Sequence, residues 1–203
     1  AHYCEATGKT QLLNVAVRMA NFMYETMGPP PRRNIVPSHP LGEEAAVRMY
    51  CLFRDHPELK TRIDAPVQEE HFLRLAEFWL EARGHHCGQP DWEHLSEPDC
   101  RKFICEKRYG EDRPSWGSYA QDHKPLLEQE TIEGHAVRAT LLCAGLAAAA
   151  VADTRADYAE AAKRLWMNMT DRKMHITGGV GAFAADEKFG PDYVLPNDAY
   201  LET

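Results

Sequence analysis

The chain has 203 residues, and 44% of them are apolar, which is enough for one domain with a sizeable core. Its formal charge is −8 at pH 7 and it has no basic stripe, which excludes nucleic acid and anionic membrane surfaces as natural partners. The longest apolar stretch, Ala139 to Ala152, is shorter than the roughly 20 residues that span a bilayer. The composition therefore favours a soluble globular protein that binds a neutral or small ligand.

The two ends of the chain read as cut. The opening residues, AHYCEATGKT, contain neither an initiator Met nor a signal peptide, and they resemble the tail of a helix that runs into a turn at Gly8. The last residues, 200–203, stop inside what reads as a new element. We therefore expect one incomplete domain over residues 1–203, truncated at both ends. A soluble, cytoplasmic location is the expectation that we favour.

Apolar residues at spacings of three and four predict a series of amphipathic helices. The first full helix runs from Leu12 to Met23, and Gly28 with the prolines after it stops the pattern. Strand signals are scarce. The further helices are predicted over Ala45–Phe53, Phe72–Leu80 with an end at Gly84, Ile132–Ala152 and Tyr158–Met169.

The helical segments repeat in kind. The pattern Ala20-x-Phe22 with Gly28 returns as Ala76-x-Phe78 with Gly84, and Ala46-Val47-Arg48 returns as Ala136-Val137-Arg138. Such self-similarity predicts stacked helical hairpins, which can extend as a solenoid or close into an α/α toroid. Residues 85–130 break the pattern and read as a long polar connection, a kind of segment that often carries function.

Two short segments look like binding motifs, but the residues around them do not support that interpretation. The run from His175 to Gly181 is rich in glycine, but it lacks the Lys-Ser/Thr of a phosphate-binding loop and does not follow a strand. His85-His86-Cys87 reads as a solvated turn, because adjacent residues seldom converge on one metal ion. The six cysteines form no CxxC pair, so we expect no disulfide framework and no four-cysteine zinc site.

The C-terminal stretch KMHITGGVGAFAADEKFGPDYVLPNDAYLET resembles the signature of glycoside hydrolase family 127 (DUF1680), the β-L-arabinofuranosidases: a TGGxG loop, a Gly-Glu-x-Phe segment, an LPND segment and Glu-Thr-Cys. Upstream, QDHKPLLEQETIEGHAVRATLLCAGLA is similar to the family's QDH and GHAVRA segments, and HPLGEEAAVRMY is similar to a degraded GHEE segment. With ATGKTQLLNVAVRMANFM, the resemblance covers nearly the whole chain. It implies an all-α fold, part of a catalytic (α/α)6 barrel with a glycine-rich active-site loop near the C-terminus.

The resemblance also assigns roles to four residues. Glu187 takes the position of the general acid/base, with Asp186 where the family has Gly; without the resemblance, an exposed loop residue is the simpler interpretation. His135 matches a histidine that contacts sugar hydroxyls, although helix capping alone also explains it. His39 matches the histidine of the GHEE segment, whose neighbours differ here. Glu202 matches a zinc-binding glutamate.

The predicted function is therefore removal of terminal β-L-arabinofuranosyl residues, with retention of configuration, from an arabinofuranosyl oligosaccharide or glycoconjugate. The family's zinc is held by one Glu and three Cys, one of them the nucleophile, and none of the six cysteines here falls in the matching motifs. We expect these ligands beyond residue 203 and expect this segment alone to be inactive. Two alternatives stay open: a sugar epimerase or isomerase using His135 and His39, and a non-catalytic helical-repeat module that binds a partner through an exposed apolar helix row.

Overall fold

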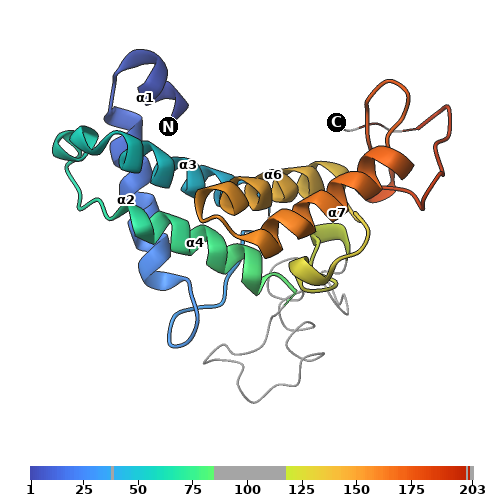
Figure 1. The fold of residues 1–203 in the computed structure, drawn as a ribbon, viewed down its shortest axis with the longest axis horizontal. Helices are drawn as coiled ribbons and strands as arrows, with labels where there is room; N and C mark the ends of the chain where they lie inside the picture. Colours follow the sequence, from blue (N-terminus) through green and yellow to red (C-terminus); the bar gives the residue numbers. More distant parts are fainter. Residues whose placement is uncertain (38, 85–117, 200, 202–203) are drawn as a thin grey trace.

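The computed structural model describes residues 1–37, 39–84, 118–199 and 201 (Figure 1). These residues form helices and loops, and within them no strand occurs, only isolated β-bridges. Residues 85–117 of the connection predicted over 85–130, with His85-His86-Cys87, lie outside the described residues, as does the metal-ligand candidate Glu202.

Six α-helices and four 3-10 helices make up the described chain. The predicted tail, α1 (His2–Thr7), ends at Gly8, whose φ of 68° is left-handed. The longer helices begin and end within a few residues of the predicted bounds. They are α2 (Gln11–Thr26), α3 (Gly42–Asp55), α4 (Glu69–Ala82), α6 (Ala136–Ala152) and α7 (Ala156–Arg172), with 3-10 turns η1 (Pro57–Arg62), η2 (Ser118–Ala120), η3 (Leu126–Glu128) and η4 (Ala185–Glu187).

One helix begins later than the sequence predicts. The apolar pattern starts at Ile132, whereas α6 begins at Ala136. Gly134 has a φ of 77°, and His135 is extended, so neither residue can continue a helix in the N-terminal direction. His135 therefore stands at the N-cap of α6, where its side chain is buried and accepts a hydrogen bond from the backbone N–H of Arg138.

The helices stack in antiparallel pairs around a common core. Figure 1 shows α3 and α6 in one row, with α4 and α7 in a second row beside it. The α3–α6 approach is close: a Cβ added at Gly145 of α6 would lie 2.8 Å from the Cβ of Glu43. The predicted hairpins are confirmed, and each sequence repeat joins two helices that pack together, α2 with α4 and α3 with α6.

Helix α2 closes one end of the arrangement. Its inner face buries Leu13, Val17 and Ala20. A second row of apolar residues stays exposed on the same helix: Leu12, Val15, Met19 and Phe22. This is the kind of row that a partner-binding helical module would present, and equally the kind that a further helix would cover in a closed toroid.

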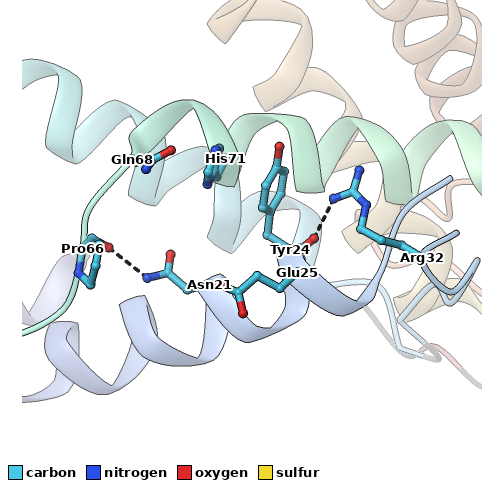
Figure 2. Close-up of a pocket in the computed structure, with 7 residues that line it drawn as sticks. All are labelled: Asn21, Tyr24, Glu25, Arg32, Pro66, Gln68 and His71. Atoms are coloured by element: carbon cyan, nitrogen blue, oxygen red, sulfur yellow. Dashed lines mark hydrogen bonds between the residues drawn. The ribbon is translucent and has the colours of Figure 1, made fainter. Parts of the chain in front are cut away.

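A polar groove of about 410 Å³ lies between α2 and α4. Figure 2 shows Tyr24 standing between His71 and Arg32, with Asn21 reaching the carbonyl of Pro66. The Tyr24 and His71 rings stack with their centroids 4.0 Å apart, and the Arg32 guanidinium lies 4.9 Å from the Tyr24 centroid. No helix in the described parts of the chain is long and apolar enough to cross a membrane.

Candidate active site

His135 and Glu187 meet directly, although 52 positions separate them in the sequence. His135 Nε2 lies 2.7 Å from Glu187 Oε2. The histidine side chain is 8% exposed and that of the glutamate 43% exposed, so the pair has one buried and one open member. The open carboxylate is accessible to a molecule arriving from solvent, while the imidazole is held by the protein.

The position of His135 at the start of α6 fixes which ring nitrogen carries the proton. Its Nδ1 accepts a hydrogen bond from the backbone N–H of Arg138, at 3.4 Å, and so caps the helix. A nitrogen that accepts a hydrogen bond carries no proton, so the neutral ring has its proton on Nε2. His135 therefore donates to Glu187 through this Nε2–H.

The turn before His135 can be made only with glycine. A Cβ at Gly134 would lie 1.6 Å from the carbonyl oxygen of Ser118, and the φ of 77° is itself left-handed. The Gly134 carbonyl accepts from the backbone N–H of Phe189 at 2.9 Å. The same glycine thus joins the start of α6 to the segment that follows Glu187.

Glu187 sits on a tight turn that the loop after α7 builds. Backbone hydrogen bonds between Phe183 and Lys188 close the turn at 3.1 and 3.2 Å, and Val180, Ala182 and Phe189 anchor it in the core. Asp186 and Glu187 are both left-handed, with φ of 61° and 49°. This explains the glycine that the family pattern has before its glutamate, because a left-handed residue favours Gly, and Asp is among the few other types that tolerate it.

Three further side chains surround the pair. The rings of His39 and Tyr119 each present an edge-on contact to His135, with centroids 6.3 and 5.5 Å away. The Arg138 guanidinium lies 5.0 Å from the Tyr119 centroid. Partial burial lowers the pKa of His39, and the nearby Arg138 and His135 lower it further, against a backbone hydrogen bond at Pro40 that raises it. His39 is accordingly a neutral imidazole at neutral pH, able to donate and accept hydrogen bonds.

A buried polar network supports this site from the core. Arg83 and Glu43 form an ion pair at 3.1 Å, with side chains 0% and 1% exposed. The guanidinium also donates to the carbonyls of Pro37 and Ala120, at 3.0 and 2.9 Å. Arg83, at the end of α4, is therefore bonded to three other segments: the one before His39, the start of α3 and the one that carries Tyr119.

The structure brings together three of the four residues singled out in the sequence: Glu187, His135 and His39. Glu202 is outside the described residues. The sequence offered Tyr119 as one of several aromatic residues of the polar connection that could line a sugar site, with a half-buried loop anchor as the simpler interpretation. Sequence reasoning did not single out Gln121, Arg138, Arg83 or Glu43. The quoted family-like segments contain Gln121, Glu43 and Arg138, and this was the one signal in the sequence that pointed to them.

The described residues do not by themselves make a metal site. No group of three His, Cys, Asp or Glu side chains that could hold a metal occurs among them. The three described cysteines, Cys4, Cys51 and Cys143, lie on three different helices as free thiols. Burial raises the pKa of the Cys143 thiol to about 12, so it is neither a ready nucleophile nor a ready metal ligand.

Comparison with known proteins identifies the family of this chain. The family model described as the β-L-arabinofuranosidase GH127 catalytic domain matches residues 1–203. The chain belongs to this family. Solved GH127 structures have an (α/α)6 barrel, so the predicted fold class is confirmed for the helical hairpins of this chain.

Three relatives place the chain within longer proteins. A non-reducing end β-L-arabinofuranosidase of Bifidobacterium longum subsp. longum is 29% identical over 99% of this chain and 28% of its own length. A GH127 β-L-arabinofuranosidase of Geobacillus stearothermophilus T6 has a TM-score of 0.76 and 30% identity, over 98% of this chain and 28% of that one. A structure of another GH127 β-arabinofuranosidase has a TM-score of 0.71 and 30% identity, over 98% and 25%. The GH127 chain described here thus spans about a quarter of their length.

Proposed function

We propose that the protein acts as a retaining glycosidase that removes terminal β-L-arabinofuranosyl residues from an oligosaccharide or glycoconjugate, with Glu187 as general acid/base. The carrying observation is the contact of 2.7 Å between the half-exposed Glu187 and the buried His135. The sugar comes from the names of the relatives, which act as β-L-arabinofuranosidases.

The two roles of Glu187 follow from the chemistry of retention. In the first step a nucleophile, expected outside the described residues, bonds to the anomeric carbon as the bond from that carbon to the glycosidic oxygen breaks, and a protonated Glu187 gives its proton to that oxygen. In the second step water displaces the nucleophile from the anomeric carbon, and the ionised Glu187 takes a proton from that water. The N–H of His135 orients this carboxylate through its contact with Oε2.

His135 and His39 are proposed to bind the sugar. The two rings lie with their centroids 6.3 Å apart, and a neutral imidazole matches the donor and acceptor character of sugar hydroxyls. Since the Nδ1 of His135 caps α6, this residue meets a hydroxyl through the Nε2 side that it shares with Glu187. His39 is more exposed and has its pKa lowered, so it is free of charge when it meets the sugar.

Zinc stays a proposal, with Glu202 as the one ligand assigned in this chain. The family resemblance implies three cysteine ligands, one of them the nucleophile, and the described residues do not supply them. We therefore derive no step through the metal. Elemental analysis of the complete gene product tests it, and a preparation that is active without zinc would contradict it.

The test is hydrolysis of p-nitrophenyl β-L-arabinofuranoside by the complete gene product, with zinc and a reductant. Replacing Glu187 by Gln keeps the shape and removes the proton transfer, so we expect kcat to fall by about 10² to 10⁴-fold. Glu25→Gln, an exposed glutamate in the α2–α4 groove, is the matched control and should leave kcat unchanged.

Other outcomes separate the competing functions. An epimerase that uses His135 and His39, whose rings lie 6.3 Å apart, would turn over free sugars and keep its activity in Glu187→Gln. A protein that hydrolyses no furanoside or pyranoside but binds a partner through the exposed row of α2 would contradict both enzyme assignments.

A further inference from the structure

We infer that Gln121 is a positioning residue for His135: its side-chain amide locks the turn that aims the imidazole at Glu187. The use of that imidazole in hydrolysis rests on the proposed function, whereas the locking itself can be tested without any activity.

The amide of Gln121 joins two segments of the site. The residue is 2% exposed, and its Nε2 lies 3.1 Å from the carbonyl oxygen of Glu133 and 3.4 Å from that of His135. On the other side the same nitrogen lies 3.2 Å from the carbonyl oxygens of both Ser118 and Tyr119. One side chain thus bonds the backbone on both sides of Gly134 to the turn that carries Tyr119.

The chemistry of these neighbours requires an amide in this orientation. All four are carbonyl oxygens, which accept and never donate, so the NH2 group, whose two N–H donors are shared among them, and not the amide oxygen must occupy the position. The backbone of Gln121 is left-handed, with a φ of 55°, a conformation that costs of order 1 kcal/mol or more for a residue other than Gly. The turn keeps Gln in spite of this cost, because a Gly there would have no amide.

Gln129 provides a matched comparison on the same turn. It is also 2% exposed, and its Nε2 also donates to backbone carbonyls, those of Gln121 at 3.0 Å and Lys124 at 2.9 Å. It makes no recorded contact to residues 133–135. The two glutamines therefore have the same residue type, the same burial and the same kind of bond, and only Gln121 reaches the backbone of His135.

The first experiment measures how well His135 is held in the 203-residue chain. Diethyl pyrocarbonate modifies accessible neutral imidazoles, and peptide mass spectrometry reports the rate at each histidine. In Gln121→Glu an acceptor replaces the donor against four carbonyls, so we expect the rate at His135 to rise about tenfold. Gln129 donates to the carbonyl of Gln121 but not to residues 133–135, so Gln129→Glu should raise that rate clearly less than Gln121→Glu does, with His71 as the internal reference in every sample.

The second experiment measures catalysis by the complete gene product. Displacing His135 misplaces both the carboxylate that it contacts and the imidazole proposed to bind the sugar, so Gln121→Glu should lower kcat/KM by about 10²-fold. Gln129→Glu should lose similar thermal stability and keep kcat/KM. Gln121→Asn suits the left-handed backbone but is one methylene too short, and it should fall between the parent and Gln121→Glu.

The outcomes separate this inference from the proposed function. Equal protection of His135 in Gln121→Glu and in the parent, or equal loss of protection in Gln129→Glu, overturns the positioning role. Hydrolysis that is absent in the parent contradicts the proposed function and leaves the protection result standing.

Discussion

The α2–α4 groove and the site around His135 contain the same kinds of side chain and use them differently. Each has a histidine beside a tyrosine and an arginine near the tyrosine ring. In the groove the rings of Tyr24 and His71 lie face to face, and Arg32 lies over the Tyr24 ring on the side away from His71 (Figure 2). Both faces of that tyrosine are thereby occupied by protein.

The site differs from the groove in what its histidine can do. His135 is buried and turned edge-on to its aromatic neighbour, and its Nε2 points at a carboxylate. Among the described residues, the groove holds no such pair for His71, although Glu25 lines the same pocket. The groove is also made by two helices, whereas the site joins the segments around His39, Tyr119, His135 and Glu187. A histidine near a tyrosine and an arginine is therefore not enough to indicate a candidate site. A second segment of the chain must also place a carboxylate against the imidazole.

The largest expected contrast between the two regions is in their arginines. Replacing Arg83 by Met should lower the free energy of unfolding by about 3 to 5 kcal/mol, because Glu43 is left as a buried, unpaired charge. Arg32→Met in the groove removes one hydrogen bond to a carbonyl and one contact with a ring, and should cost about 1 kcal/mol. Urea unfolding of the two variants measures both.

A second substitution would identify the source of the Arg83 effect. If the unpaired charge is the cause, adding Glu43→Leu to Arg83→Met should recover much of the lost stability. No recovery would mean that the bonds from Arg83 to the carbonyls of Pro37 and Ala120 are what the protein depends on.

The tyrosines give a smaller contrast, seen in activity as well as stability. Tyr24→Leu breaks the stack with His71 and should cost about 1 kcal/mol of stability, with no effect on hydrolysis by the complete gene product. Tyr119→Leu removes the edge contact with His135 and the ring beside Arg138, and should lower kcat/KM about tenfold through misplacement of the imidazole. Equal activity in the two variants would contradict the distinction between groove and site.

Local patterns predicted the helices well and the site poorly. The spacing of apolar residues located α2, α3, α4 and α7, because a helix with one buried face has apolar residues at every third or fourth position. The start of α6 was misplaced, since Ile132 continues the apolar pattern while the left-handed Gly134 breaks the backbone.

The site could be predicted only through the family-like segments. No local rule connects His135 with Glu187, because their contact depends on how α7 and the loop after it return to the start of α6. Buried polar residues such as Gln121 and Arg83 have no periodic signature, and their importance lies in partners that are distant in sequence.

The smallest expected effect concerns the turn that carries Glu187. Asp186 has a φ of 61°, which Gly adopts without strain. Gly also has greater freedom in the unfolded chain, which offsets part of this gain. Asp186→Gly should therefore raise the free energy of unfolding by about 0.5 kcal/mol in total. The exposed contact at 3.4 Å between Asp186 and Lys188 adds little that could be lost. Asp186→Ala has the opposite expected sign, because Ala keeps the Cβ and lacks the tolerance of Asp for this conformation. Thermal unfolding of the three proteins decides: if Ala and Gly shift the midpoint in the same direction, the side chain and not the backbone conformation sets the stability of this turn.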